Sequence, residues 1–94
     1  MIKIEANGYS VYEYATDHKE WYYNRLLHRE DGPAIEYPGG SKKWFKNGLR
    51  HREDGPAVEW GNGSKEWWLN HKQYTQDEFI LLQFTKGIII NDQT

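Results

Sequence analysis

The chain has 94 residues and no cysteine, with 12 Lys and Arg against 14 Asp and Glu, so its formal net charge is -2. This charge argues against an electrostatic nucleic-acid binder and against a strongly acidic mimic of DNA, and the lack of cysteine excludes disulfides, a thiolate nucleophile and a Cys-type zinc site. The first residues lack the apolar core of a signal peptide and no apolar run is long enough to span a bilayer, so we expect a soluble cytoplasmic protein without membrane insertion.

We expect one domain, in which residues 1–10 form an N-terminal strand or cap and residues 11–74 form a repeat. The seven residues from His28 to Ala34 return letter for letter from His51 to Ala57, 23 positions later. The same spacing relates three further sets, which are Trp21, Trp44 and Trp67, then Asn24, Asn47 and Asn70, then Tyr14, Tyr37 and Trp60. A fixed period of this size predicts one supersecondary unit stacked on copies of itself.

Each copy reads as a β-hairpin. In the middle copy, residues 34–37 and 42–46 are rich in β-branched and aromatic residues, and Gly and Pro separate them at 38–41. Asn47 and Gly48 then close the unit, as a tight turn requires. The fold class that we predict is mainly β, an antiparallel meander of stacked hairpins with a C-terminal capping helix and a short final strand.

The register of the hairpins is expected to follow from charge. A loop of two or four residues would set two glutamates against each other in the first and third copies, which repulsion disfavours. We therefore expect a three-residue loop with the register slipped by one, so that Ile35 pairs with Phe45 and Val58 with Trp68. Which of Trp44 and Phe45 is buried stays open, because a one-residue slip exchanges the two faces of a strand.

Residues 75–94 break the repeat and are expected to cap it. Thr75 followed by Glu78 is a capping box, which predicts a helix that begins near Gln76. Four apolar residues are expected to face inward, namely Phe79, Ile80, Leu82 and Phe84. Gly87 is expected to end the helix, and residues 88–90 to form a short final strand. The segment from Ile88 to Ile90 is alternatively a strand that pairs with a second chain, which would give a homodimer.

The repeat resembles the MORN repeat, a β-hairpin unit that stacks into an elongated sheet. The matching positions in one unit are Phe45, Asn47-Gly48, His51 and Gly63-Ser64. Because Arg52 stands where a MORN unit usually has Gly, the chain is closer to a variant group with His-Arg-Glu-Asp-Gly-Pro-Ala that is associated with bacterial and bacteriophage proteins. The resemblance implies a scaffold or a contact surface for proteins or lipids, and it brings no catalytic residues.

The repeated motif is interpreted first as a structural corner. The residues assigned to this turn are His28, Asp31, Gly32 and Pro33, with His51, Asp54, Gly55 and Pro56 in the next copy. Asp accepts backbone hydrogen bonds, Gly supplies an unusual φ and Pro fixes the entry into the next strand. An anion-binding ladder of Arg29 and Arg52 is the sharper alternative. A metal or hydrolytic site of His28, His51, Glu30 and Glu53 is disfavoured, because repeat-related residues spread along a stack.

The aromatic content of 16% exceeds what a thin sheet needs for its core and indicates a binding surface. The candidate binding residues are Arg29, Arg52, Tyr37, Trp60, Trp68 and Tyr23. We expect a non-enzymatic protein-binding module without cofactor or metal. If the resemblance to bacteriophage proteins holds, the expected role is a small stoichiometric inhibitor of a host enzyme or defence system. The alternatives are a receptor for nucleotide or single-stranded nucleic acid, which we expect less, and a self-assembling structural unit.

Overall fold

The computed structural model describes the backbone of residues 1–91 and the side chains of residues 1–84. In chain order its elements are β1 (Ile2–Ala6), β2 (Tyr9–Glu13), β3 (Lys19–Tyr23), β4 (Leu26–Leu27), β5 (Ile35–Glu36), β6 (Lys42–Lys43), β7 (Phe45–Lys46), β8 (Leu49–Arg50), β9 (Val58–Glu59), β10 (Lys65–Leu69), β11 (Lys72–Tyr74) and α1 (Gln76–Asn91).

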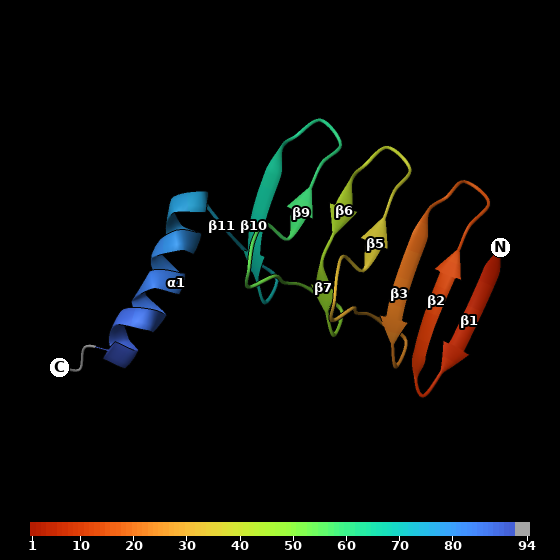
Figure 1. Cartoon of the computed structure of the whole chain (residues 1–94), viewed down its shortest axis with the longest axis horizontal. Helices are drawn as coiled ribbons and strands as arrows, with labels where there is room; N and C mark the ends of the chain where they lie inside the picture. Colours follow the sequence, from red (N-terminus) through yellow and green to blue (C-terminus); the bar gives the residue numbers. More distant parts are fainter. Residues whose placement is uncertain (92–94) are drawn as a thin grey trace.

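The strands form an antiparallel meander. One sheet runs in the order β1-β2-β3-β5-β6-β9-β10-β11, with β4 paired to β3, and β7 pairs with β8 as a separate ladder. The chain measures 54 × 34 × 17 Å, and Figure 1 shows one row of hairpins that runs from β1 to α1. The predicted meander with a C-terminal helix is therefore confirmed. Within residues 1–91 no second layer covers the sheet, so both faces carry part-exposed side chains.

Three-residue loops reverse the chain at one end of the hairpins. They are closed by backbone hydrogen bonds of 2.8–2.9 Å from Tyr14 to His18, from Tyr37 to Ser41 and from Trp60 to Ser64. The third loop residue has positive φ in each copy, with values of 65° at Asp17, 97° at Gly40 and 95° at Gly63. Gly and Asp are found there because this backbone conformation is costly for most side chains.

Two-residue turns reverse the chain at the opposite end. Both central residues have positive φ in each turn, which defines type I′, and the pairs are Asn7-Gly8, Asn24-Arg25, Asn47-Gly48 and Asn70-His71. Two of these turns place a residue other than Gly or Asn in this conformation, since φ is 69° at Arg25 and 70° at His71. The turns therefore hold some backbone strain in the first and third repeats.

A row of alternating charges crosses six strands on one face of the sheet. The residues that lie directly opposite one another along this row are Glu13, Lys19, Glu36, Lys42, Glu59 and Lys65. An opposite-charge pair directly across two strands contributes roughly 0.2–1 kcal/mol, so the row favours this register in every repeat.

This register corrects the one predicted from the sequence. Ile35 pairs with Lys43 rather than with Phe45, and Val58 does not pair with Trp68. The three-residue loop is present, but the strands slip in the opposite direction. The observed slip is the one that places a lysine across from a glutamate in all three copies.

The core is small and lies at the strand starts of the middle repeats. Among the described residues the buried apolar side chains are Ala34, Ile35, Ala57, Val58 and Phe79. Trp21, Trp44 and Trp67 are only half-buried, and so is Phe45, so neither candidate of the pair Trp44 and Phe45 is a core residue. A sheet with so few buried residues relies on contacts between neighbouring repeats.

Helix α1 begins as predicted and ends later than predicted. The Thr75 N–H donates to Glu78 Oε1 at 2.8 Å and the Glu78 N–H donates to Thr75 Oγ1 at 3.1 Å, which completes the capping box. Gly87 does not end the helix, which continues to Asn91 and includes the expected strand at residues 88–90. A single glycine costs about 1 kcal/mol in a helix interior and does not by itself stop it. The chain end at residues 92–94 lies outside the described residues.

The helix buries one of its four expected core residues. Phe79 is 6% exposed, whereas Ile80 is 53%, Leu82 38% and Phe84 63% exposed, so the prediction that these three face inward was wrong. The reason is that α1 packs mainly against β10 and β11 at the end of a one-layer sheet. No described helix has the length and apolar character needed to cross a bilayer.

Candidate binding site

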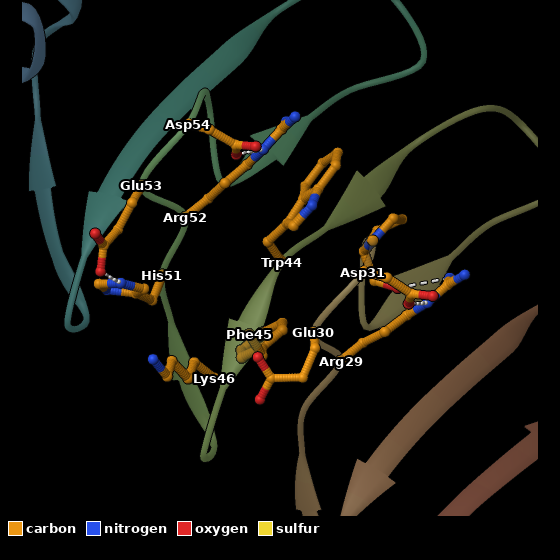
Figure 2. Close-up of a pocket in the computed structure, with 12 residues that line it drawn as sticks. Arg29, Glu30, Asp31, Trp44, Phe45, Lys46, His51, Arg52, Glu53 and Asp54 are labelled. Carbon is orange, nitrogen blue, oxygen red and sulfur yellow. Dashed lines mark hydrogen bonds and ion pairs between the residues drawn. The ribbon is translucent and has the colours of Figure 1, made fainter.

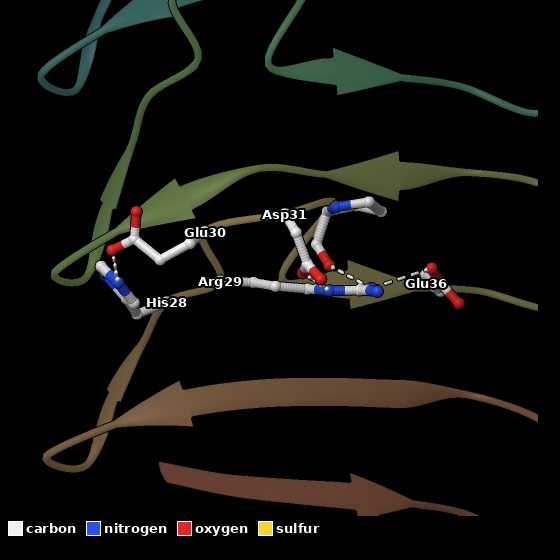
Figure 3. A network of polar contacts seen from close by, with 6 residues as sticks. His28, Arg29, Glu30, Asp31 and Glu36 are labelled. Carbon is white, nitrogen blue, oxygen red and sulfur yellow. Dashed lines mark hydrogen bonds and ion pairs between the residues drawn. The ribbon is translucent and has the colours of Figure 1, made fainter. Parts of the chain in front are cut away.

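The residues of the repeated motif form two corners, which we call the first corner (residues 28–34) and the second corner (residues 51–57). In the first corner the His28 ring is 5% exposed and points toward Glu30 (Figure 3). Its Nδ1 accepts a hydrogen bond of 2.9 Å from the Asn47 N–H, and its Nε2 lies 2.6 Å from Glu30 Oε2. A nitrogen that accepts a backbone N–H carries no proton, so Nε2 is the protonated nitrogen and donates to Glu30.

Arg29 is held by its own repeat. Its Nε donates to Asp31 Oδ1 at 2.9 Å, and its Nη1 donates to the Pro33 carbonyl at 3.1 Å and to Glu36 Oε2 at 3.2 Å (Figure 3). The guanidinium also lies over the Trp21 ring, 3.9 Å from its centroid. A guanidinium with two carboxylates, a carbonyl and an indole face is largely satisfied within the fold.

The second corner repeats these contacts one unit later. Arg52 donates to Asp54 at 2.8 Å and to Glu59 at 3.1 Å, and lies 3.9 Å from the centroid of the Trp44 ring. His51 Nδ1 accepts from the Asn70 N–H at 2.9 Å, as His28 does from Asn47. Each corner therefore joins its own repeat to the next one, which is the contact that a stack needs at every layer.

A groove of about 660 Å³ lies between the two corners (Figure 2). Its lining comprises Arg29, Glu30, Asp31, Gly32 and Pro33 on one side, His51, Arg52, Glu53 and Asp54 on the other, and Trp44, Phe45 and Lys46 between them. Because both corners contribute to its lining, the groove forms where the first and second corners lie next to each other.

Exposure separates the acids of this groove from its arginines. Asp31 and Asp54 are each 85% exposed, whereas Arg29 and Arg52 are 22% and 21% exposed. Glu30 is also exposed, at 68%. The exposed charged groups of the groove are therefore mainly carboxylates, together with Lys46, the one exposed lysine or arginine in its lining.

The face of the sheet opposite the charge row carries a row of aromatic rings and cationic side chains. The His18 ring lies 4.9 Å from both the Tyr14 and the Tyr37 centroids, and Lys43 Nζ lies 5.5 Å from the Tyr37 ring and 5.1 Å from the Trp60 ring. Lys43 adjoins Lys42 of the charge row in the same strand, so its side chain points to the other face.

Position 43 and its equivalents in the other two repeats differ in charge, and their aromatic neighbours differ accordingly. Glu20 accepts hydrogen bonds from Tyr14 and Tyr22, at 3.3 and 2.7 Å. Two repeats later, Glu66 accepts from Trp60 Nε1 and Trp68 Nε1, both at 2.9 Å. In the middle repeat the position equivalent to Glu20 and Glu66 is Lys43. The position equivalent to Tyr22 and Trp68 is Phe45, whose ring has no polar atom to donate a hydrogen bond.

Among the ionisable groups of this face, Glu66 and Tyr22 have shifted pKa values. Burial opposes the ionisation of Glu66, but the two indole N–H groups together with Arg50 and Lys43 outweigh it and hold the pKa of Glu66 below its ordinary value. Burial and the hydrogen bond to Glu20 raise the pKa of Tyr22. The charged form of Glu66 is therefore stabilised by its own aromatic neighbours.

The six candidate binding residues do not form one site. Arg29 and Arg52 flank the groove, whereas Tyr37 and Trp60 lie on the other face, on either side of Lys43. The two remaining candidates lie near the type I′ turns: Trp68 carries Arg50 over its ring at 4.7 Å, and Tyr23 packs against Tyr9 with centroids 4.4 Å apart.

Sequence reasoning missed the floor of the groove, formed by Trp44, Phe45 and Lys46. The signal was available, since these residues precede the second motif copy by the same interval at which Trp21 to Tyr23 precede the first. Comparisons with protein families, with curated proteins and with solved structures found no match. Within the described residues no group of three His, Asp or Glu side chains is arranged to hold a metal ion.

Proposed function

We propose that this protein is a non-enzymatic protein-binding module, and that the groove between its two corners receives a segment of the partner that carries basic side chains. The observation behind this proposal is the contrast in exposure, because the aspartates of the groove are 85% exposed while its arginines are about one-fifth exposed. The aspartate carboxylates of the groove are therefore accessible to a ligand, whereas its guanidinium groups are engaged in contacts within the protein.

This contrast favours a protein over a nucleic acid. A phosphate backbone requires accessible Arg or Lys, and in this groove it would meet the exposed oxygens of Asp31 and Asp54 before Arg29 or Arg52, which leaves Lys46 as the one exposed cation among the groove's lysines and arginines. A lysine or arginine of a partner protein would meet the same oxygens favourably, and the Trp44 indole in the groove lining suits its aliphatic stem.

The apolar surface of α1 also supports a protein partner. Four neighbouring side chains of the helix are between 38% and 63% exposed, namely Ile80, Leu81, Leu82 and Phe84. Exposed apolar side chains gathered on one element are typical of surfaces that contact another protein.

The repeat assignment belongs to the same proposal. We propose a MORN-like unit, which the 23-residue hairpin period and the Asn-Gly turn support. The resemblance to bacteriophage proteins extends the proposal to a small stoichiometric inhibitor of a host enzyme or defence complex, a step that rests on analogy.

The test is affinity capture of the tagged protein from a nuclease-treated bacterial lysate, with mass spectrometry of what is retained. We compare the wild type with the double variant Asp31→Asn/Asp54→Asn, which keeps the oxygen that accepts from each arginine and removes the charge. We expect one protein near a one-to-one ratio with the wild type and about tenfold less with the double variant.

Asp17→Asn is the matched control, because Asp17 is an exposed aspartate in the loop between β2 and β3 and asparagine accepts its positive φ. It should retain as much partner as the wild type. Recovery of nucleic acid alone from a lysate without nuclease would replace the proposal with the nucleic-acid alternative, and equal retention by all three proteins would remove the groove from it.

A further inference from the structure

The N-terminal edge of the sheet is open and apolar. Within residues 1–91 strand β1 pairs on one side only, with β2, and all five of its residues are exposed. Ile2 is 56% and Ile4 64% exposed, and Met1 before them is 74% exposed. Natural edge strands are usually shortened, bulged or covered, because their free N–H and C=O groups pair readily with another strand.

The hairpin geometry fixes which backbone groups of β1 are free. Ala6 and Tyr9 close the two-residue Asn7-Gly8 turn, and the register then continues with Ile4 opposite Val11. In an antiparallel pair hydrogen-bonded and non-bonded residue pairs alternate, and a two-residue turn closes on a bonded pair. The N–H and C=O groups of Ala6 and Ile4 therefore point to β2, and those of Lys3 and Glu5 point outward.

The side-chain pattern of β1 is complementary to itself when two copies lie antiparallel. Its sequence is Ile2-Lys3-Ile4-Glu5-Ala6, with apolar residues on one face and one charge of each sign on the other. If two copies pair about a two-fold axis through Ile4, Lys3 lies opposite Glu5 of the second copy and Glu5 lies opposite its Lys3. Shifting the pairing by two residues in either direction sets two lysines or two glutamates together.

Backbone and side chains select the same register. The residues with outward N–H and C=O groups are Lys3 and Glu5, and they are also the residues that face each other across this axis. Each such pair exchanges two backbone hydrogen bonds and adds one ion pair, while Ile4 meets its own copy on the apolar face. Within one chain Lys3 Nζ already lies 2.8 Å from Glu5 Oε2, so the two charges sit on the same exposed face of the edge.

We propose that β1 is a homodimer interface, in which it pairs antiparallel with β1 of a second copy, with Lys3 against Glu5, and joins the two sheets edge to edge. The interface is separate from the groove between the corners and from helix α1, and it leaves both accessible in the dimer. A five-residue pairing is short, so the dimer is weak and reversible, with a dissociation constant of roughly 100 µM.

Sedimentation equilibrium of the full chain tests this pairing with a charge exchange. The wild type should move from monomer to dimer mass as its concentration rises to about 1 mM. Glu5→Lys and Lys3→Glu should each weaken dimerisation by about tenfold or more, because each sets two like-charge pairs across the axis. An equimolar mixture of the two variants should dimerise again, since one variant then carries two positive charges on this face of β1 and the other carries two negative charges. The double exchange Lys3→Glu/Glu5→Lys should also dimerise, because it restores one charge of each sign to every copy.

A backbone variant separates strand pairing from side-chain docking. Glu5→Pro removes an outward N–H and the carboxylate but no hydrogen bond to β2, whereas Glu5→Ala removes the carboxylate and keeps the N–H, so Glu5→Pro should stay folded by circular dichroism and dimerise more weakly than Glu5→Ala. A wild type that stays monomeric up to about 1 mM overturns the proposal. It is equally overturned if Glu5→Lys dimerises like the wild type, which would place the contact elsewhere, or if the mixture of single variants stays monomeric.

Discussion

Replacing His28 by alanine should destabilise the fold by about 1 kcal/mol more than the same change at His51. Both rings accept a backbone N–H of the next repeat at 2.9 Å, but the bond to the Asn47 N–H is part-buried and the bond to the Asn70 N–H is exposed. An amide left without a partner away from water costs about 1–3 kcal/mol, whereas an exposed amide is solvated again and loses about 1 kcal/mol.

The two costs can be worked from these contacts. For His28→Ala we add about 2 kcal/mol for the stranded amide and about 1 kcal/mol for the packing of a ring that is 5% exposed, which gives about 3 kcal/mol. Glu30 is 68% exposed and returns to water at little cost. For His51→Ala we add about 1 kcal/mol for the exposed amide and about 1 kcal/mol for the packing of a ring that is 10% exposed, which gives about 2 kcal/mol.

Urea unfolding measures this difference. With a slope near 1 kcal/mol/M for a chain of this size, the midpoint of His28→Ala should fall about 1 M below that of His51→Ala. His28→Asn should recover about 1 kcal/mol, because its amide oxygen can accept from the Asn47 N–H. Equal costs at the two histidines, or no recovery with asparagine, would refute the reasoning that the buried amide makes the difference.

Three further predictions follow from single positions. Gly61→Ala should lose about 2 kcal/mol in thermal unfolding, because its Cβ would collide with the Gly39 carbonyl oxygen, while Gly39→Ala, where a Cβ meets open space, should change stability by less than about 0.5 kcal/mol. Arg25→Gly should gain about 1 kcal/mol by removing the strain of a φ of 69°, and an unchanged melting temperature would contradict it. The folded-state pKa of Glu66 lies below its ordinary value of 4.5, so its stabilisation is complete above that pH and is lost as the pH falls through the lowered pKa. The stability gap between wild type and Glu66→Gln should therefore narrow from pH 6 to about pH 3, and a gap independent of pH would be inconsistent with this.

The repeat itself was predictable because local rules and the 23-residue period agree. Asn-Gly turns, Gly-rich loops and the capping box each predict a specific backbone conformation, and the structure has these conformations at the predicted positions. The register was missed although its signal was present, since a three-residue loop with the opposite slip places Lys42 across from Glu36 and Lys65 across from Glu59. Charge pairing in every copy is a stronger criterion than the pairing of apolar residues in two.

The helix and the groove were less accessible from sequence. Apolar residues in a C-terminal helix normally indicate burial, but Ile80 and Phe84 have no layer to pack against in a one-layer sheet. The groove depends on the distance between two corners and on the satisfaction of Arg29 and Arg52 by their own repeats, which are tertiary properties. Sequence therefore named the residues of the corners without showing which of their charges face solvent.

The charge row also bears on how copies of the chain can assemble. It ends with Glu13 toward β1 and with Lys65 toward the helix, so the two ends of a sheet are complementary and a head-to-tail stack could grow without closing. Two features oppose such growth: β1 places Ile2 opposite Glu13 and so ends the row, and α1 contacts β10 and β11 at the other end. The edge that stays open has a sequence that is complementary to itself, and two-fold pairing through it closes after two copies instead of propagating.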